Sequence, residues 1–164
     1  MVVLNKAVIL EFIMLDEKQK QNDLYWLEVA KLIGRKSKCK RRKVGSLILD
    51  IYGRMVASGR NGHPRNSFKD DFCFRYDVKS HENMNAGACI HSEQNTLLFS
   101  NFKEIQDGTM YITCPPCEYC SPLIMQAGIL RLVYLKDGFD EPGIELLRNL
   151  GADKLMEIIS YEPN

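Results

Sequence analysis

Two short stretches of this chain carry most of its chemistry: residues 89–95 read CIHSEQN, and residues 115–120 read PPCEYC. His91, Cys117 and Cys120 offer one imidazole and two thiols, which are ligand types that zinc prefers. Each stretch stands where a helix is expected to begin. Cys117 and Cys120 are three residues apart, so on a helix both sulfurs can face one point. The two stretches together predict a metal site that is assembled from two helix starts.

On its own, the Cys117-x-x-Cys120 pair is equally typical of a redox dithiol. Adding His91 makes a set of three ligands, which leaves one tetrahedral position open and is typical of catalytic zinc. Glu93 lies two residues past His91, so it can reach the open side without binding the metal. There it can take a proton from an activated water and return it to a ring nitrogen and a leaving amine, as hydrolytic deamination requires. The combination H-x-E followed by P-C-x-x-C is the signature of the zinc deaminases.

The composition indicates one ordinary globular domain. The chain has 164 residues, of which 45% are hydrophobic and 26% are charged. These values exclude a coiled coil, a collagen-like chain and a disordered tail, and no apolar run reaches the roughly 18 residues of a membrane-spanning helix. Six cysteines without a secretory signal predict reduced thiols inside a cell. We therefore expect a cytoplasmic protein (in the host cytoplasm if a phage encodes it) with no membrane partner.

The basic residues are unevenly distributed. Residues 35–43 read RKSKCKRRK and hold seven of the 22 Lys and Arg residues. The rest of the chain therefore has 15 basic against 21 acidic residues, a balance of −6. This basic segment predicts a local anion site more than a broad nucleic-acid surface, although a solvated loop would look the same.

Hydrophobic periodicity and turn signals predict an α/β fold. Residues 1–22 read as an N-terminal extension, either a loosely packed helix or a contact with a partner, and residues 23–164 read as the catalytic domain. Helices are expected over residues 23–33 (with Asn22 and Asp23 as the cap), 92–102, 116–127 and 142–149. Strands are expected over residues 44–50, 54–58, 109–113, 130–135 and 154–159, and residues 59–88 read as a long irregular segment. This order predicts a three-layer α-β-α sandwich with a central, mixed, five-stranded sheet.

From about Asp23 to Leu155 the chain resembles the cytidine deaminase superfamily, and most closely the deoxycytidylate (dCMP) deaminases of phage and bacterial type. The resemblance rests on five segments: residues 37–41 with 44–45, 59–62, 89–95, 115–120 and 126–129. It implies that His91, Cys117 and Cys120 hold zinc and that Glu93 moves the proton. It also implies a set of substrate contacts: Asn61 on a sugar hydroxyl, Arg41 on the 5′-phosphate, Ser92 and Cys114 on the pyrimidine edge through their backbone, and Phe139 packed on the nucleotide.

The same resemblance implies regulation and assembly. An allosteric nucleotide site, activated by dCTP and inhibited by dTTP, is expected near Lys38, Arg60, Asn61 and Gly62, with Mg²⁺ accompanying the nucleotide. Arg60 replaces the tyrosine that is usual in this loop and offers a further phosphate contact. A homo-oligomer, often a hexamer, is typical. Some members carry a second, structural zinc, for which Cys39, Cys73 and His81 are candidates, with Cys89 or His63 as a fourth ligand; small buried thiols are the alternative.

We therefore expect a zinc enzyme that converts dCMP to dUMP and ammonia, and so supplies dUMP for dTTP synthesis. The alternatives are a deaminase of dCTP, of a nucleoside or of a nucleic acid such as tRNA, and a zinc-stapled binding module without activity. A steep loss of affinity with salt would indicate a nucleic-acid substrate.

Overall fold

The computed structural model describes residues 6–67, 89–138 and 141–163. Its strands are β1 (Gly45–Leu49), β2 (Met55–Arg60), β3 (Thr109–Ile112), β4 (Arg131–Leu135) and β5 (Glu157–Tyr161). They form one five-stranded sheet in the order β2-β1-β3-β4-β5. Strand β1 pairs antiparallel with β2 and β3, whereas β3, β4 and β5 run parallel. The prediction of a central, mixed, five-stranded sheet is confirmed.

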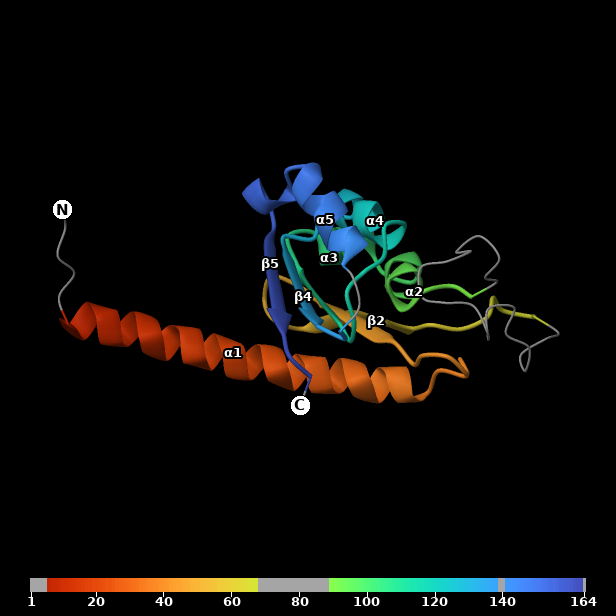
Figure 1. Ribbon diagram of the computed structural model, residues 1–164, viewed down its shortest axis with the longest axis horizontal. Coiled ribbons are helices and arrows are strands. Elements are labelled where there is room, and N and C mark those ends of the chain that lie inside the picture. Colours follow the sequence, from red (N-terminus) through yellow and green to blue (C-terminus); the bar gives the residue numbers. More distant parts are fainter. Residues whose placement is uncertain (1–5, 68–88, 139–140, 164) are drawn as a thin grey trace.

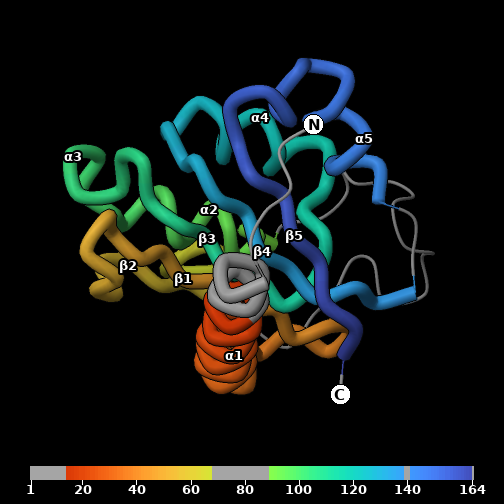
Figure 2. Tube along the Cα trace, turned by 90° about the vertical axis from the view of Figure 1, so that its left-hand side faces the viewer, coloured from red at the N-terminus to blue at the C-terminus, as the bar shows by residue number. Residues whose placement is uncertain are grey.

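Helices cover both faces of this sheet. They are α1 (Lys6–Arg35), α2 (Ser92–Leu98), α3 (Phe102–Ile105), α4 (Cys120–Gln126), α5 (Pro142–Asn149) and the 3₁₀ helix η2 (Ala152–Lys154). Helix α1 crosses one face, and α2, α4 and α5 lie on the other (Figures 1 and 2). The predicted three-layer α-β-α sandwich is therefore confirmed. Among the described residues, no helix is both long and apolar enough to span a membrane.

The two layers of core follow from the alternation of side chains along each strand. Tyr111 and Val133 point toward α1 and pack with Leu27 of that helix. Their neighbours Met110 and Leu132 point the other way, into the core beneath α4 and α5. Because every central strand buries side chains on both faces, its sequence reads as a continuous apolar run.

Helix α1 is held to the sheet by a buried polar contact. Asp23 is fully buried, and its carboxylate accepts hydrogen bonds from Arg131 at 2.7 Å, Tyr111 at 2.8 Å and Tyr161 at 2.9 Å. Burial opposes the ionisation of Asp23, but the hydrogen bonds from Arg131, Tyr111 and Tyr161 and the charge of Arg131 outweigh it, so its pKa lies below the ordinary value. Asp23 therefore stabilises the packing of α1 on strands β3, β4 and β5.

This role of Asp23 corrects one sequence prediction. Helix α1 begins at Lys6 and runs through residues 22 and 23 without a break, so Asn22 and Asp23 do not cap a helix start. The side chain of Asp23 bonds to residues of the sheet instead of to backbone amides of its own helix. As Figure 1 shows, the N-terminal half of α1 extends past the edge of the domain, and residues 14–22 are all exposed.

Three other predicted elements have different bounds. The helix expected over residues 92–102 is divided, because Asn101 caps a new short helix by accepting a hydrogen bond from the Lys103 amide at 3.1 Å. The helix expected from residue 116 begins only at Cys120. The last strand begins at Glu157, after the turn η2, and not at residue 154. The helix predicted over residues 142–149 is confirmed.

Candidate metal centre and active site

Three side chains converge between the starts of α2 and α4. The Nδ1 atom of His91 lies 3.4 Å from the sulfur of Cys117 and 3.4 Å from that of Cys120. The three ligand atoms all lie within 4.8 Å of one another, and this is the only such group among the described residues. Cys117 and Cys120 are 8% and 0% exposed. The sequence prediction that these three residues meet is therefore confirmed by their geometry.

The residues present fit a zinc ion. Bonds of about 2.3 Å to sulfur and about 2.0 Å to nitrogen, at tetrahedral angles, place a sulfur and a nitrogen about 3.5 Å apart. The observed separations of 3.4 Å between His91 Nδ1 and each sulfur match that spacing. Two thiolates also balance the charge of a divalent cation, and three protein ligands leave one position for water or substrate.

The Cys117–Cys120 turn differs from the expected helical pair. Cys120 is the first residue of α4, but Cys117 lies in the turn before it, where its carbonyl accepts hydrogen bonds from the amides of Cys120 and Ser121, both at 3.0 Å. This turn, and not a full helical repeat, brings the two sulfurs together.

The two thiols have opposite acidities. The hydrogen bond from Cys120 holds the pKa of Cys117 below its ordinary value, and the nearby His91 acts in the same direction against the effect of burial. Donation of that bond, together with burial, raises the pKa of Cys120. A cation bound here would favour the thiolate form of both cysteines and would release their protons.

His91 is fixed by the start of α2. It is the N-cap residue of that helix, and its backbone amide donates to the side chain of Gln94 at 2.9 Å. Helix α2 in turn rests on β2 at Gly59, where an added Cβ would lie 2.6 Å from the amide nitrogen of Thr96 and 2.7 Å from the carbonyl oxygen of Ser92. Gly59 therefore permits the close approach that sets the position of α2 on the sheet.

Glu93 lies beside this centre and is only 3% exposed. Its Oε2 atom accepts a hydrogen bond from the hydroxyl of Ser92 at 2.8 Å, and its carboxylate is also within hydrogen-bonding reach of the Cys120 thiol. A carboxylate that is held in this way and shielded from bulk water can transfer a proton to and from a bound molecule.

Cys114 is close to the centre but is not part of the ligand group. It is 6% exposed, and burial together with the charge of Glu93 raises its pKa to about 12. The Cys114 side chain is therefore a neutral thiol at physiological pH. The predicted contact of its backbone with a pyrimidine remains a prediction.

Asn61 and the basic segment lie next to one another. Asn61 accepts a hydrogen bond from the Val44 amide at 2.9 Å and donates one to the Arg42 carbonyl at 2.8 Å. It therefore joins the end of the basic segment to the loop after β2. Arg42 forms an ion pair with Asp137. The positive charge of Arg42 also acts to lower the pKa of Cys114, against the larger effect of burial. The sequence predicted a role for Arg41 and did not indicate the ion pair of Arg42, because Asp137 lies 95 positions from Arg42 along the chain.

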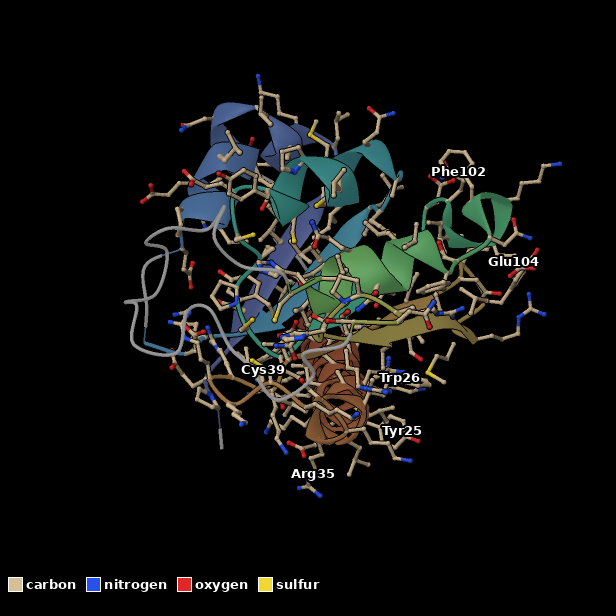
Figure 3. All side chains as sticks on the ribbon, turned by 90° about the vertical axis from the view of Figure 1, so that its right-hand side faces the viewer. Tyr25, Trp26, Arg35, Cys39, Phe102 and Glu104 are labelled. Atoms are coloured by element: carbon tan, nitrogen blue, oxygen red, sulfur yellow. The ribbon has the colours of Figure 1, made fainter. Side chains whose placement is uncertain are left out.

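A cavity of about 800 Å³ is lined by the residues that were predicted for regulation. Its lining includes Lys38, Arg60, Asn61 and Gly62, together with His63 and Arg65. The Arg65 guanidinium lies 4.7 Å from the centre of the Phe99 ring, and the buried Nδ1 atom of His63 has no hydrogen-bond partner among the described residues. In Figure 3, Cys39, which also lines the cavity, lies far from Phe102 and Glu104 of α3.

Three of the predicted site residues lie outside the described parts of the chain: Phe139, Cys73 and His81. Cys39 and His63 line the same cavity, but within the described parts of the chain no second group of metal ligands includes them. The five described cysteines are free thiols.

Comparison with known proteins agrees with this geometry. The family described as the cytidine and deoxycytidylate deaminase zinc-binding region matches residues 20–136. Deoxycytidylate deaminase of Saccharomyces cerevisiae is 34% identical over 91% of this chain and 51% of its own length. The corresponding enzyme of Mycobacterium phage D29 is 33% identical over 70% of this chain and 94% of its own. The chain thus spans about half of the yeast relative and nearly all of the phage relative.

A solved structure shows the same fold. The dCMP deaminase of cyanophage S-TIM5, crystallised with dCMP and dUMP, superposes with a TM-score of 0.67 at 26% identity, over 86% of this chain and 97% of that one. The mixed sheet and the His-Cys-Cys group at two neighbouring helix starts agree with the zinc-binding region by which this family is described. The chain belongs to the cytidine and deoxycytidylate deaminase family.

Proposed function

We propose that this chain catalyses the hydrolytic deamination of dCMP to dUMP and ammonia. The observation that supports this most strongly is the convergence of His91, Cys117 and Cys120 beside the buried carboxylate of Glu93. The deoxycytidylate deaminases among its relatives support the choice of substrate. We also propose the division into an extension, residues 1–22, and a catalytic domain, residues 23–164.

His91, Cys117 and Cys120 would hold the zinc ion, which acts as a Lewis acid and turns water into a nucleophile near neutral pH. Glu93 accepts a proton from the attacking water and delivers it to N3 of the cytosine ring. As the bond between C4 and the amine breaks, Glu93 takes the proton of the new C4 hydroxyl and passes it to the departing nitrogen, which leaves the C4 carbonyl of dUMP. Water and dCMP thus become dUMP and ammonia, with Glu93 returned to its starting state.

We assign the sugar hydroxyl to Asn61 and the 5′-phosphate to Arg41, with the backbone of Ser92 and Cys114 on the pyrimidine edge and Phe139 against the nucleotide. The position of Asn61 between the basic segment and the loop after β2 supports its part of this assignment. A permanently charged, planar guanidinium suits a phosphate group.

We also propose that the cavity lined by Lys38, Arg60, Asn61 and Gly62 binds a regulatory nucleotide, dCTP as activator and dTTP as inhibitor, with Mg²⁺ on its phosphates. The cationic side chains of Arg60 and Arg65 and the exposed Phe99 ring support an anionic ligand with a flat base. In Lys38→Ala and Arg60→Ala variants, the response to dCTP and dTTP should fall, whereas Lys103→Ala on α3 should respond like the wild type.

Two further parts of the proposal concern metal and assembly. A second zinc would involve Cys39, Cys73 and His81, and counting zinc ions per chain tests it: two support it and one contradicts it. A cytoplasmic homo-oligomer, in the form of a hexamer, is tested by the molar mass in solution.

The decisive experiment is a substrate panel on protein that has been stripped with a chelator and reloaded with zinc. The panel contains dCMP, dCTP, CMP, deoxycytidine and an oligonucleotide that contains deoxycytidine. We expect release of ammonia from dCMP that depends on zinc and is restored by it. Zinc-loaded, folded protein that leaves dCMP unchanged would overturn the proposal, and faster turnover of the oligonucleotide would assign the site to nucleic acid.

A further inference from the structure

The first turn of α5 packs against the turn that carries the metal-ligating cysteines. Gly143 is the second residue of α5. A Cβ atom on Gly143 would overlap the carbonyl oxygen of Pro116 and would lie 2.5 Å from Ser121 Oγ and 2.7 Å from the carbonyl carbon of Cys117. Real side chains do not tolerate such contacts, so only glycine allows this approach.

Residue 143 must be a glycine because a side chain has no room there, and not because its backbone conformation is unusual. Gly143 is helical and is not among the glycines with a positive φ angle. A glycine within a helix is less favourable than an alanine. At this position it therefore lowers helix stability while it provides the close contact.

The contact reaches the metal ligands directly. The carbonyl of Cys117 accepts the amides of Cys120 and Ser121 at 3.0 Å, so the Pro116–Cys117 peptide and the turn that holds both sulfurs are one unit. Cys120 and Ser121 are fully buried. Because these hydrogen bonds join the Cys117 carbonyl to Cys120 and Ser121, a displaced Pro116–Cys117 peptide moves the sulfurs with it.

Helix α5 cannot retreat from this contact. The hydroxyl of Tyr134 in β4 donates to Glu141 Oε2 at 2.7 Å, and the Glu141 carbonyl accepts the Ile144 amide at 2.9 Å. Ile144 and Leu147 are fully buried in the core. The start of α5 is thus held from the sheet side while Gly143 touches the cysteine turn.

We infer that Gly143 is a positioning residue of the metal centre: by lacking a side chain, it lets α5 support the Pro116–Cys117 peptide and so fixes the direction of the cysteine sulfurs. The inference rests on the metal site of the proposed function. Gly143 touches neither metal nor substrate and acts only through the cysteine turn.

The test measures metal binding and not activity alone. In Gly143→Ala, we expect zinc affinity, measured by competition with a chelator, to fall about 10- to 100-fold, as is typical when the support of a ligand is removed. With cobalt in place of zinc, the visible bands that report the tetrahedral sulfur-nitrogen geometry should change in shape and intensity.

Gly108→Ala is the matched control. Gly108 lies at the end of β3 opposite the cysteine turn and is also tightly packed, since a Cβ there would lie 2.5 Å from the Leu49 carbonyl oxygen. We expect Gly108→Ala to lower thermal stability but to keep zinc affinity and the cobalt spectrum.

Should Gly143→Ala fail to fold, the Ser121→Ala/Gly143→Ala double variant takes its place, because it removes the contact with Ser121 Oγ.

Wild-type zinc affinity and spectrum in the Gly143 variant would overturn the inference. An equal loss of zinc affinity in Gly108→Ala would overturn it as well, because the effect would then be general destabilisation. If the wild type itself binds no zinc, the proposed function fails; if the wild type binds zinc and deaminates dCMP while the variant matches it, only this inference fails.

Discussion

Arg131 places its two terminal nitrogens 2.7 Å from the two carboxylate oxygens of Asp23. This paired contact joins the middle of helix α1 to the first residue of β4, two segments that are 108 positions apart. Asp23 is fully buried and Arg131 is 15% exposed at its side chain, so the pair is largely removed from water. Helix α1 is therefore held to the sheet by the Asp23–Arg131 ion pair and, in the residues that follow Asp23, by apolar packing.

Replacing Asp23 by Asn should destabilise the fold strongly. The change removes the buried anion from the Arg131 guanidinium, which keeps its ion pair with the exposed carboxylate of Glu157. The loss of one partner of a buried pair costs up to about 3–5 kcal/mol. Urea denaturation at pH 7 measures this. Glu28→Gln, which breaks an exposed pair with Lys31, is the control and should change stability by less than about 1 kcal/mol. Equal effects of the two variants would contradict the structural role of Asp23.

The contribution of Asp23 should also depend on pH in a defined direction. The pKa of Asp23 is lower in the folded protein than its ordinary value of 3.8. Its ionised form therefore stabilises the fold fully above that ordinary value, and the contribution is lost as the pH falls through the lowered pKa. The difference in unfolding free energy between wild type and Asp23→Asn should be constant from pH 7 to 5 and shrink below pH 4. A difference that grows in acid would contradict this assignment.

Glu93→Gln should abolish nearly all deamination while zinc remains bound. Glutamine keeps the shape of the side chain but cannot accept and return a proton, and such general acid–base catalysis contributes about 10²- to 10⁴-fold. The turnover number for dCMP and the zinc content of the same preparation are the two measurements. A variant with full zinc and wild-type turnover would show that Glu93 does not carry the proton.

Gly59→Ala should displace helix α2 and with it His91 and Glu93. The added methyl group would lie 2.6 Å from the Thr96 amide and 2.7 Å from the Ser92 carbonyl oxygen, and such overpacking costs about 1–3 kcal/mol. Thermal unfolding and the turnover number for dCMP should both fall. Ser58→Ala, at the exposed neighbouring position, should leave both unchanged. Wild-type stability and turnover in Gly59→Ala would refute the tight contact between α2 and β2.

Arg41→Ala should raise the KM for dCMP about 10- to 100-fold, since a hydrogen bond to a charged group contributes about 1.5–3 kcal/mol. The KM for deoxycytidine, which has no phosphate, should change little. Arg42→Ala is the informative comparison, because Arg42 is already paired with Asp137. If the substrate-dependent effect appears in Arg42→Ala and not in Arg41→Ala, the phosphate contact belongs to Arg42.

Local patterns predicted the secondary structure well wherever packing agreed with them. The helix over residues 142–149 begins with Pro142 at a position where its missing amide costs nothing, so the sequence signal was complete. At Asp23 the same kind of signal was misleading. An aspartate before an apolar run is typical of a helix cap, but here its side chain bonds to Arg131 and two tyrosines from distant strands. Such partners are invisible to a local pattern.

The candidate site divides in the same way. The residue types and spacings of His91, Glu93, Cys117 and Cys120 are sufficient to predict a zinc deaminase centre, because the chemistry of the ligands and of the proton carrier resides in the side chains themselves. The pairing of Arg42 with Asp137 and the contact of Gly143 with the cysteine turn depend on chain segments that only folding brings together.

From the sequence alone came the predicted ligand set, the predicted proton carrier and the alternation that places a mixed sheet between helices, because each of these depends on residue type and short-range spacing. The tertiary structure alone decided where α1 begins, how the basic segment is paired, and which glycines allow helices to approach the metal centre. Those features depend on distances between residues far apart in the chain, and close packing in three dimensions sets these distances.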